Sequence, residues 1–441
     1  MNLLNKISSV ESLRLAWAKL EKFNKESHGL TGETIAEFEL NKEDKILSIS
    51  KRLQEGTYQF SPYRAVLIPK SKGKFRPLQI PEVSDRVVIK AIAIELEEHF
   101  KELLEKSRGL SFAYQKGLGV KEAVEKINEY CQNGYSYVLE ADLINFFGTV
   151  DKDSLLNDVV FKRLSDTTIN TLIQQALNQS IGNLDSFNVE QKKYFENIDK
   201  GIPQGNALSP LLSNIFLSPF DLRLKDKGFK LVRYADDFVI MCTSEKECEE
   251  AYIECCTVLE ELNLNIHKLE EGGKTRIVNF NKHDTMDFLS VTFDGNVFYP
   301  SFANVERLKS KIRDVCNGKD KYCVSTLLIK IKNKLDGWVS AFYYTDIQRY
   351  SSEIDAFINR QLYLSLAKMD WKFTASSLGK LPHKFRHKNE SPKCLSFLQR
   401  KNSGIPFCME LVNAKITELK KAEKWKGEII FSITKKTPIT I

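Results

Sequence analysis

Hydrophobic and polar residues follow two periods along the chain, one helical and one extended, and together they predict a mixed α+β protein. Apolar residues recur at helical spacing in residues 9–24, 46–56, 85–104 and 245–262, and in three successive segments within 303–370. Shorter runs rich in β-branched and aromatic residues lie at 63–81, 137–139, 231–240 and 286–295. We therefore expect hairpins and a sheet among helices, followed by a compact helical bundle.

Two adjacent acids interrupt one of the apolar β runs. Residues 231–240 read LVRYADDFVI, with Asp236 and Asp237 in the middle. Because neighbouring side chains on a strand point to opposite faces, the pair fits a sheet only if the chain turns tightly there and delivers a carboxylate to the tip. Taken alone, the same residues also fit an ordinary surface hairpin with a polar turn.

A third acid in a similar setting favours a site over a plain turn. Asp142 follows the β-favouring residues 137–139 and precedes Phe146 and Phe147. Strand-borne carboxylates from distant parts of a chain can meet on neighbouring strands. Such carboxylates are what a two-metal phosphoryl-transfer site requires, because hard divalent cations take oxygen ligands and clamp the attacking and leaving oxygens.

At this point the sequence resembles reverse transcriptases, since YADD with an upstream Asp142 and Phe146-Phe147 is similar to the palm of RNA-templated DNA polymerases. The resemblance runs over about residues 10–370 and is greatest to group II intron-like bacterial enzymes, in particular the defence-associated ones. It implies an α+β right-hand polymerase with an antiparallel palm sheet. The implied parts are an N-terminal extension (1–60), fingers (61–135), palm (136–300), helical thumb (301–370) and a short basic C-terminal RNA-binding domain (371–441).

The resemblance also implies roles for individual residues. The catalytic acids are Asp142, Asp236 and Asp237, and two Mg²⁺ ions are expected at these acids and at Leu143. The nucleotide-binding residues are Lys70, Arg76, Phe147, Gln204 and Lys274. The template- or primer-binding residues are Gln115, Lys116, Phe288, Leu289, Lys330, Lys334, Lys384, Arg386 and Lys388.

The chemistry of the nucleotide-binding residues suits these roles, with alternatives for some. Arg76 can grip phosphate oxygens bidentately where Lys70 supplies a point charge, although a solvated turn carries similar residues. Phe147 fits either a gate against a 2′-hydroxyl or core packing, and the two phenylalanine side chains should diverge if the chain stays extended. Lys274 can neutralise leaving pyrophosphate or pair with a palm acid.

Glycines and a proline surround Gln204 in the segment GIPQGNALSP, at 201–210. Gly201 and Gly205 indicate a strained loop whose backbone approaches its neighbours closely. The loop can present the Gln204 amide to a sugar or base. In the hairpin predicted at 286–295, Ser290 stands where the resembling family has glycine in its primer grip.

Charge is concentrated at the end of the chain. Residues 371–441 hold 15 Lys and Arg against 5 Asp and Glu, whereas the whole chain has a net charge of +7. This basic tail suggests a polyanion such as nucleic acid. His383 and His387 could form a metal pair, but their basic flanks favour RNA backbone contact.

Composition argues against several other classes of protein. The 42% hydrophobic content and the absence of a long apolar run predict a protein that does not enter the membrane, and we expect it in the cytoplasm. Nine scattered cysteines without a Cys-x-x-Cys pair argue against structural zinc and a disulfide framework.

The sequence thus predicts an RNA-directed DNA polymerase whose partners are an RNA template, a nucleic-acid primer, the cDNA product and dNTPs. The resemblance implies a structured non-coding RNA as template and a role in anti-phage defence. Two alternatives stay open, a group II intron-type mobile-element enzyme or maturase and an RNA-binding scaffold with a vestigial site. The sequence does not predict the oligomeric state.

Overall fold

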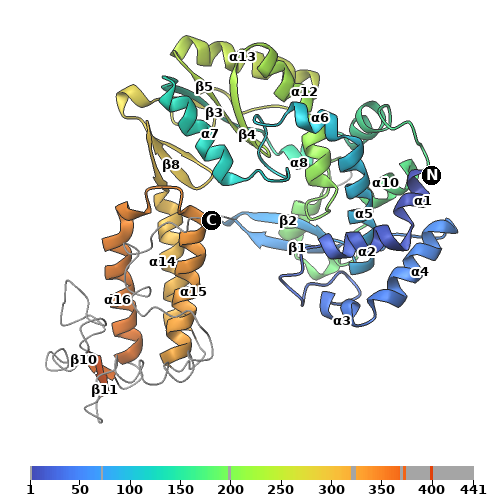
Figure 1. The fold of residues 1–441 in the computed structure, drawn as a ribbon, viewed down its shortest axis with the longest axis horizontal. Coiled ribbons are helices and arrows are strands. Elements are labelled where there is room, and N and C mark those ends of the chain that lie inside the picture. The colour runs from blue at the N-terminus through green and yellow to red at the C-terminus, as the bar shows by residue number, and fades with distance from the viewer. Residues whose placement is uncertain are drawn as a thin grey trace. The chain divides into compact units, whose positions relative to one another are not determined.

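A computed structural model of the 441-residue chain describes residues 2–70, 73–196, 200–318, 324–367, 371–373 and 398–400. The chain forms two compact units, residues 1–281 and 282–441. Figure 1 shows the helices and strands of each unit. The mixed α+β composition agrees with the prediction from periodicity.

The first unit is mainly helical. Its α-helices are α1 (Leu3–Ile7), α2 (Val10–Lys19), α3 (Ile35–Leu40), α4 (Lys42–Gln54), α5 (Val83–His99), α6 (Lys101–Lys106), α7 (Val120–Gln132), α8 (Phe146–Thr149), α9 (Lys152–Ser154), α10 (Asn170–Leu177), α11 (Val189–Lys192), α12 (Ser209–Asp226) and α13 (Glu245–Glu261). Short π- or 3₁₀-helical turns are η2 (Leu155–Val160), η3 (Leu184–Ser186), η4 (Lys193–Phe195) and η5 (Phe280–Lys282).

Four antiparallel strands form the sheet of the first unit, in the order β4-β5-β3-β6. They are β3 (Tyr137–Asp142), β4 (Lys230–Tyr234), β5 (Asp237–Cys242) and β6 (Arg276–Asn279). The apolar residues that predict β5 are buried, from Phe238 to Cys242. Helix α13 packs on β3 and β5, while α7 and α12 pack on β4, so the sheet is held firmly among helices.

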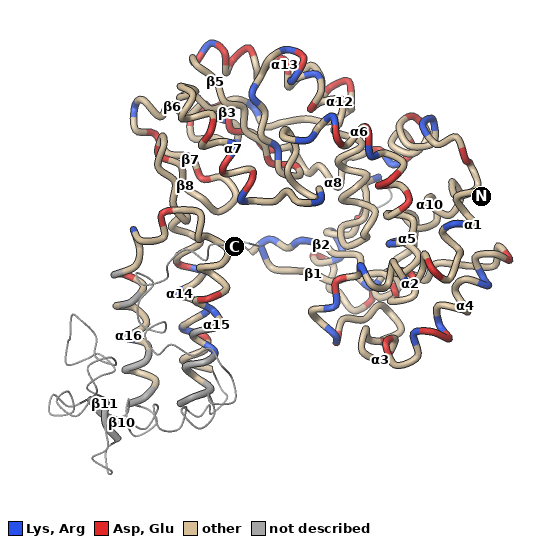
Figure 2. The backbone as a smooth tube through the Cα atoms, viewed as in Figure 1, with Lys and Arg blue, Asp and Glu red and all other residues tan. Residues whose placement is uncertain are grey.

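A separate hairpin carries the basic residues predicted to grip phosphate. Strands β1 (Arg64–Pro69) and β2 (Phe75–Ile80) pair antiparallel, with Ile68 opposite Arg76. Lysine and arginine colour the free end of this hairpin (Figure 2). Residues 71 and 72, between the two strands, lie outside the described residues.

One predicted helix is in fact two. The apolar period over residues 85–104 predicts a continuous helix, but the structure ends α5 at His99 and starts α6 at Lys101. Phe100 lies between them with φ −92° and ψ 9°, and its side chain is buried. Because α6 packs against α12, tertiary packing accounts for the break that the period alone does not reveal.

The second unit combines a three-stranded meander with three long helices. Its elements are β7 (Met286–Phe288), β8 (Val291–Asp294), β9 (Val297–Pro300), α14 (Phe302–Asn317), α15 (Val324–Phe342), η6 (Ile347–Tyr350), α16 (Ser351–Ala367), β10 (Trp371–Phe373) and β11 (Leu398–Arg400). Helix α14 packs against both α15 and α16, as the helical periodicity predicts. None of the helices in the described part of the chain is long and apolar enough to cross a bilayer.

Candidate active site

The sheet register brings the three predicted acids together. Asp142, at the end of β3, lies opposite Asp237, the first residue of β5. Asp236 occupies the tight turn between β4 and β5, and its carbonyl accepts from the Leu143 amide at 3.4 Å. The turn places one carboxylate at the tip and a second on the strand beside Asp142.

The turn has a strained backbone. Ala235, the first of its two central residues, has φ 61°, in the left-handed region where residues other than glycine are uncommon. Its neighbours Tyr234 and Asp237 pair across the hairpin. A strained turn of this kind persists only where the surrounding structure holds it in place.

Burial and neighbouring negative charges raise the pKa values of two of the acids. Loss of water around the carboxylate, followed by the negative charges of Asp236 and Asp142, raises the pKa of Asp237 to about 7. The residue as a whole is nevertheless exposed. Burial, followed by the charge of Asp142, also raises the pKa of Asp236. Lys274 Nζ donates to Asp142 Oδ2 at 2.7 Å, so in this structure the lysine pairs with one of the three acids.

These carboxylates fit a magnesium site by the chemistry of their donors. In the described residues no three His, Cys, Asp or Glu side chains are already arranged around a common point for a metal. Mg²⁺ does not need such a cage, because it keeps several waters and binds through one or two carboxylates plus substrate phosphates. The like charges that raise the pKa of Asp237 are those that a divalent cation would neutralise.

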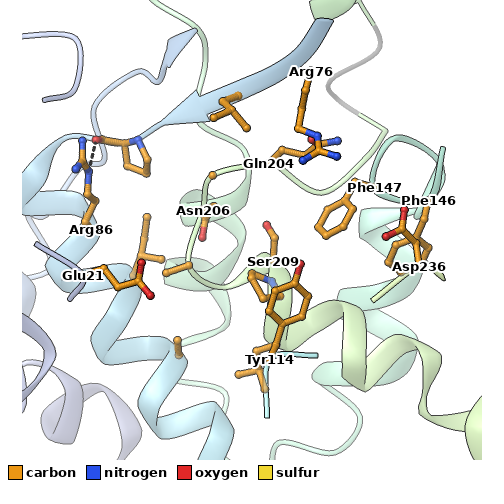
Figure 3. Close-up of a pocket in the computed structure, with 18 of the residues that line it drawn as sticks. Glu21, Arg76, Arg86, Tyr114, Phe146, Phe147, Gln204, Asn206, Ser209 and Asp236 are labelled. Carbon is orange, nitrogen blue, oxygen red and sulfur yellow. Dashed lines mark hydrogen bonds between the residues drawn. The ribbon is translucent and has the colours of Figure 1, made fainter. Parts of the chain in front are cut away.

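A cavity of about 1070 Å³ opens beside the acids. Its lining includes the predicted nucleotide-binding residues and metal-site residues together: Lys70, Arg76, Asp142, Leu143, Phe147, Gln204, Asp236, Asp237 and Lys274. Figure 3 shows Phe147 between Asp236 on one side and Arg76 with Gln204 on the other. The cavity is therefore large enough for a nucleotide and has acids at one end and cationic groups beside them.

Phe146 and Phe147 differ in burial, but not because the chain is extended. Residues 146–149 form the short helix α8, which follows Asn145 with φ 49°. Phe146 is 1% exposed and belongs to the core, whereas Phe147 is partly exposed, and both are among the residues that line the cavity. The chain does not stay extended here, so the condition under which the two side chains were expected to diverge is not met, because the left-handed Asn145 starts a helical turn.

The loop around Gln204 is fastened on two sides. The Ile202 amide donates to the Phe147 carbonyl at 2.8 Å, and a Cβ on Gly201 would collide with that same oxygen. The backbone amide of Gln79, on β2, donates to the backbone carbonyl of Gln204 at 2.7 Å. Gly205 has φ 113°, and a Cβ there would lie 2.7 Å from the Gln79 carbonyl oxygen. The loop thus joins Phe147 to the basic hairpin.

Other predicted residues are not brought into this cavity. Gln115 donates to the Ser111 carbonyl and Lys116 is exposed, and neither lines the cavity. Phe288 is buried on β7, and Leu289 follows it in the turn to β8 of the second unit. Lys330 and Lys334 lie on α15 of that unit, the first partly buried and the second exposed. Lys384, Arg386, Lys388, His383 and His387 lie outside the described residues.

Three residues that the sequence did not single out contribute to the site. Tyr114 and Asn206 line the cavity, and Arg233 is fully buried directly behind the acidic turn. A charged residue inside the apolar run LVRYADD is a usable signal for Arg233, because a buried charge needs a partner. Tyr114 is adjacent to Gln115, but its left-handed φ of 59° has no signature in the sequence.

The chain is similar in sequence to several known proteins. A sequence model of the family described as "Reverse transcriptase (RNA-dependent DNA polymerase)" matches residues 68–293. Protein YkfC of Escherichia coli is 32% identical over 257 residues, covering 49% of this chain and 64% of that protein. The group II intron-encoded protein LtrA of Lactococcus lactis is 31% identical over 237 residues, covering 54% of this chain and 36% of that protein.

The chain thus spans less than two thirds of the length of these relatives. Among solved structures, a chain of a partial Cas6-RT-Cas1–Cas2 complex is 28% identical, with a TM-score of 0.34 over 59% of this chain and 42% of that one. A telomerase structure from Candida albicans is 13% identical, with a TM-score of 0.39 over 70% of this chain and 59% of that one.

Proposed function

The chain belongs to the reverse transcriptase family, and from this premise we propose that it copies an RNA template into complementary DNA by adding dNTPs to a primer. The observation that carries the proposal is the meeting of Asp142, Asp236 and Asp237 at one end of a cavity that also contains Lys70 and Arg76. Carboxylates beside cationic groups are the arrangement that nucleotidyl transfer needs.

Each of the cavity residues that the sequence predicted has a role in this proposal. Arg76 and Lys70 bind the triphosphate, and Gln204 contacts the sugar or base from its fastened loop. Phe147 stands where a 2′-hydroxyl would collide with its ring. The Asp142, Asp236 and Asp237 carboxylates and Leu143 would hold two Mg²⁺ ions, which would activate the primer hydroxyl and stabilise charge on the phosphates.

Lys274 has two positions in the proposed cycle. In this structure its ammonium neutralises Asp142, and its side chain is 64% exposed, so it is free to swing away from the acid. When the nucleotide is bound, the same ammonium can turn to the leaving pyrophosphate, where it would stabilise developing negative charge. In this proposal, the two roles that the sequence left open for Lys274, pairing with an acid and neutralising pyrophosphate, are successive states of one side chain.

We retain the division into an N-terminal extension, fingers, palm, thumb and basic tail as part of the proposal. The β1–β2 hairpin supports the assignment of fingers, the β4-β5-β3-β6 sheet that of the palm, and the α14–α16 helices that of the thumb. Lys309, on α14, is buried and paired with Glu306 and Glu353, so the proposal assigns it no contact with a duplex.

Primer extension tests the proposed activity. The purified chain is given an RNA template, an annealed primer, dNTPs and Mg²⁺, and we expect DNA complementary to the template. The double variant Asp236→Ala, Asp237→Ala should lose more than about 1000-fold of the rate. Asp158→Asn is the control, because Asp158 is an exposed acid outside the cavity lining that pairs with Lys162 across a helical turn. Unchanged activity in the double variant would contradict the metal assignment.

For the biological role, we propose that the template is an associated structured non-coding RNA and that the activity serves anti-phage defence. Support comes from the sequence resemblance and from the basic tail of residues 371–441. Sequencing RNA that co-purifies from the host tests it: one enriched structured RNA is expected, and background cellular RNA would contradict it. The similarity to LtrA favours a second candidate, a group II intron-type enzyme, for which the enriched RNA would be an intron.

A further inference from the structure

A buried polar cluster lies directly behind the acidic turn. Arg233, on β4, has no exposed surface, and it donates from Nε and Nη2 to the two carboxylate oxygens of Asp221 at 2.7 and 2.6 Å. Its Nη1 donates to Asn214 Oδ1 at 3.2 Å and to the Ala235 carbonyl at 2.9 Å. Asp221 and Asn214 both lie on α12 and are buried.

Stability alone does not explain this cluster. Removing two charges from water costs several kcal/mol each, and well-packed apolar residues at such positions are often at least as stable as the ion pair. An apolar side chain, however, cannot donate to the Ala235 carbonyl. That carbonyl belongs to the strained residue of the turn, with φ 61°, and the next residue along the chain is Asp236.

The same cluster also holds a second strained residue at the cavity. Asn214 Nδ2 donates to the Ala113 carbonyl at 2.9 Å, and the Arg233 backbone pairs with Leu110 and Phe112. The residue after Ala113 is Tyr114, which has φ 59° and lines the cavity. Figure 3 shows Tyr114 and Asp236 among the residues around this cavity. The buried guanidinium therefore supports left-handed Ala235 directly, and through Asn214 it supports the residue before left-handed Tyr114. Tyr114 lines the cavity, as does Asp236, the residue after Ala235.

We propose that Arg233 is a positioning residue, which holds the Ala235 turn so that the Asp236 carboxylate stands in its reacting geometry. Through Asn214 the same residue fixes the segment that presents Tyr114. Arg233 touches neither substrate nor metal and acts only through these neighbours. The inference rests on the proposed polymerase function, and its test must separate a failure of one from a failure of the other.

The main test replaces the ion pair with apolar residues of similar volume. The variant Arg233→Met, Asp221→Leu removes both buried charges, and with them the donor to the Ala235 carbonyl. We expect it to fold, as judged by circular dichroism and thermal melting. Binding of Mn²⁺ in the absence of nucleotide, followed by electron paramagnetic resonance, should weaken by about 10- to 100-fold. In single-nucleotide incorporation, kcat should fall by about 100-fold while KM for dNTP changes far less.

A matched control makes the same exchange on the outside of α12. Arg223 donates to Glu254 at 2.9 Å, and both residues lie away from the cavity lining. The variant Arg223→Met, Glu254→Leu should retain the Mn²⁺ affinity and kcat of the unsubstituted protein. This control separates loss of an ion pair in general from loss of the contact behind the turn.

A rescue experiment decides the matter if the apolar variant does not fold. Arg233→Lys keeps one buried positive charge but cannot reach Asp221 and the Ala235 carbonyl together with a planar fork. Adding Ala235→Gly removes the strain, because glycine adopts a φ near 61° without steric cost. We expect the double variant Arg233→Lys, Ala235→Gly to have a Mn²⁺ affinity and a kcat at least about tenfold higher than those of Arg233→Lys alone.

The outcomes are distinguishable. Absence of primer extension by the unsubstituted protein would count against the proposed function. An active unsubstituted protein together with a folded apolar variant of the same Mn²⁺ affinity and kcat would overturn the role of Arg233. If only the lysine series folds, failure of Ala235→Gly to recover either quantity would overturn it as well.

Discussion

The proposed gating role of Phe147 can be tested by changing that one side chain. Its ring lines the cavity beside Asp236, and its backbone carbonyl anchors the loop of Gln204, so truncating the ring leaves the main-chain contacts in place. We expect Phe147→Ala to raise the kcat/KM for ribonucleotides relative to deoxyribonucleotides by about 10- to 100-fold. Single-nucleotide incorporation measures the ratio, with Phe23→Ala, a 96% exposed aromatic, as control. An unchanged ratio would exclude the gating role.

The variant Gly205→Ala tests how tightly the loop around Gln204 packs against the β1–β2 hairpin. Alanine there combines a left-handed φ of 113° with a Cβ 2.7 Å from the Gln79 carbonyl oxygen. We expect Gly205→Ala to lower the free energy of unfolding by about 2–5 kcal/mol and to raise KM for dNTP.

Gly228→Ala separates the two contributions at Gly205. Gly228 also has a positive φ, of 88°, but a Cβ there meets nothing within 4 Å. Gly228→Ala should therefore lower the free energy of unfolding by only about 1 kcal/mol. Urea unfolding compares the two variants, and equal losses would contradict the close approach of the loop to β2.

At the scale of elements, the β7–β8 turn carries a conformation that its sequence does not favour. Leu289 and Ser290 have φ values of 53° and 66°, and Phe288 pairs with Val291 across the turn. Because glycine adopts such angles freely, Ser290→Gly should stabilise the second unit by about 1 kcal/mol. Ser290→Ala, which removes the hydroxyl but keeps the Cβ, should give no gain. Thermal melting distinguishes them, and destabilisation by glycine would contradict the turn geometry.

The start of α5 is linked to the preceding segment by a buried acid. Asp85 accepts from the Tyr58 hydroxyl at 2.7 Å and from the Ser61 amide at 3.0 Å. Burial raises the pKa of Asp85 to about 6. Because the folded pKa lies above the unfolded one, Asp85 binds its proton more tightly in the folded chain. Its contribution to stability is complete below about pH 4 and is lost as the pH rises through 6.

Asp85→Asn removes this titration. The difference in unfolding free energy between the unsubstituted protein and Asp85→Asn should fall by up to about 3 kcal/mol between pH 4 and pH 7, from a pKa shift of about two units. Urea denaturation at several pH values measures it. A difference that stays constant over this range would mean that Asp85 is not perturbed by burial.

Sequence patterns predicted the elements better than their boundaries and turns. The apolar period located α5, but burial of Phe100 and packing of α6 on α12 decided where the helix breaks. The position of the acids in β-favouring runs predicted that they can meet on neighbouring strands, and the register of β3 and β5 places Asp142 opposite Asp237. The left-handed conformations of Ala235 and Tyr114 could not be predicted, because residues of these types rarely adopt a positive φ.

At the scale of the whole molecule, residues far apart in the chain form one site because β3 and β5 are neighbours in the sheet and the Gln204 loop is tied to β2. Asp142 comes from the first of these strands and precedes the acidic turn by more than ninety residues. An activity that depends on Asp142 as strongly as on the turn would therefore report the complete assembled site.

The rate of first-nucleotide incorporation on an RNA template is the most direct test of the central claim. Measured with Mg²⁺ and the templated dNTP, the unsubstituted protein should extend the primer. Asp142→Asn should be slower by more than about 1000-fold, and Asp158→Asn should match the unsubstituted rate. Extension by Asp142→Asn at the unsubstituted rate, or no extension by the unsubstituted protein, would contradict the claim that this chain is an RNA-directed DNA polymerase using these acids.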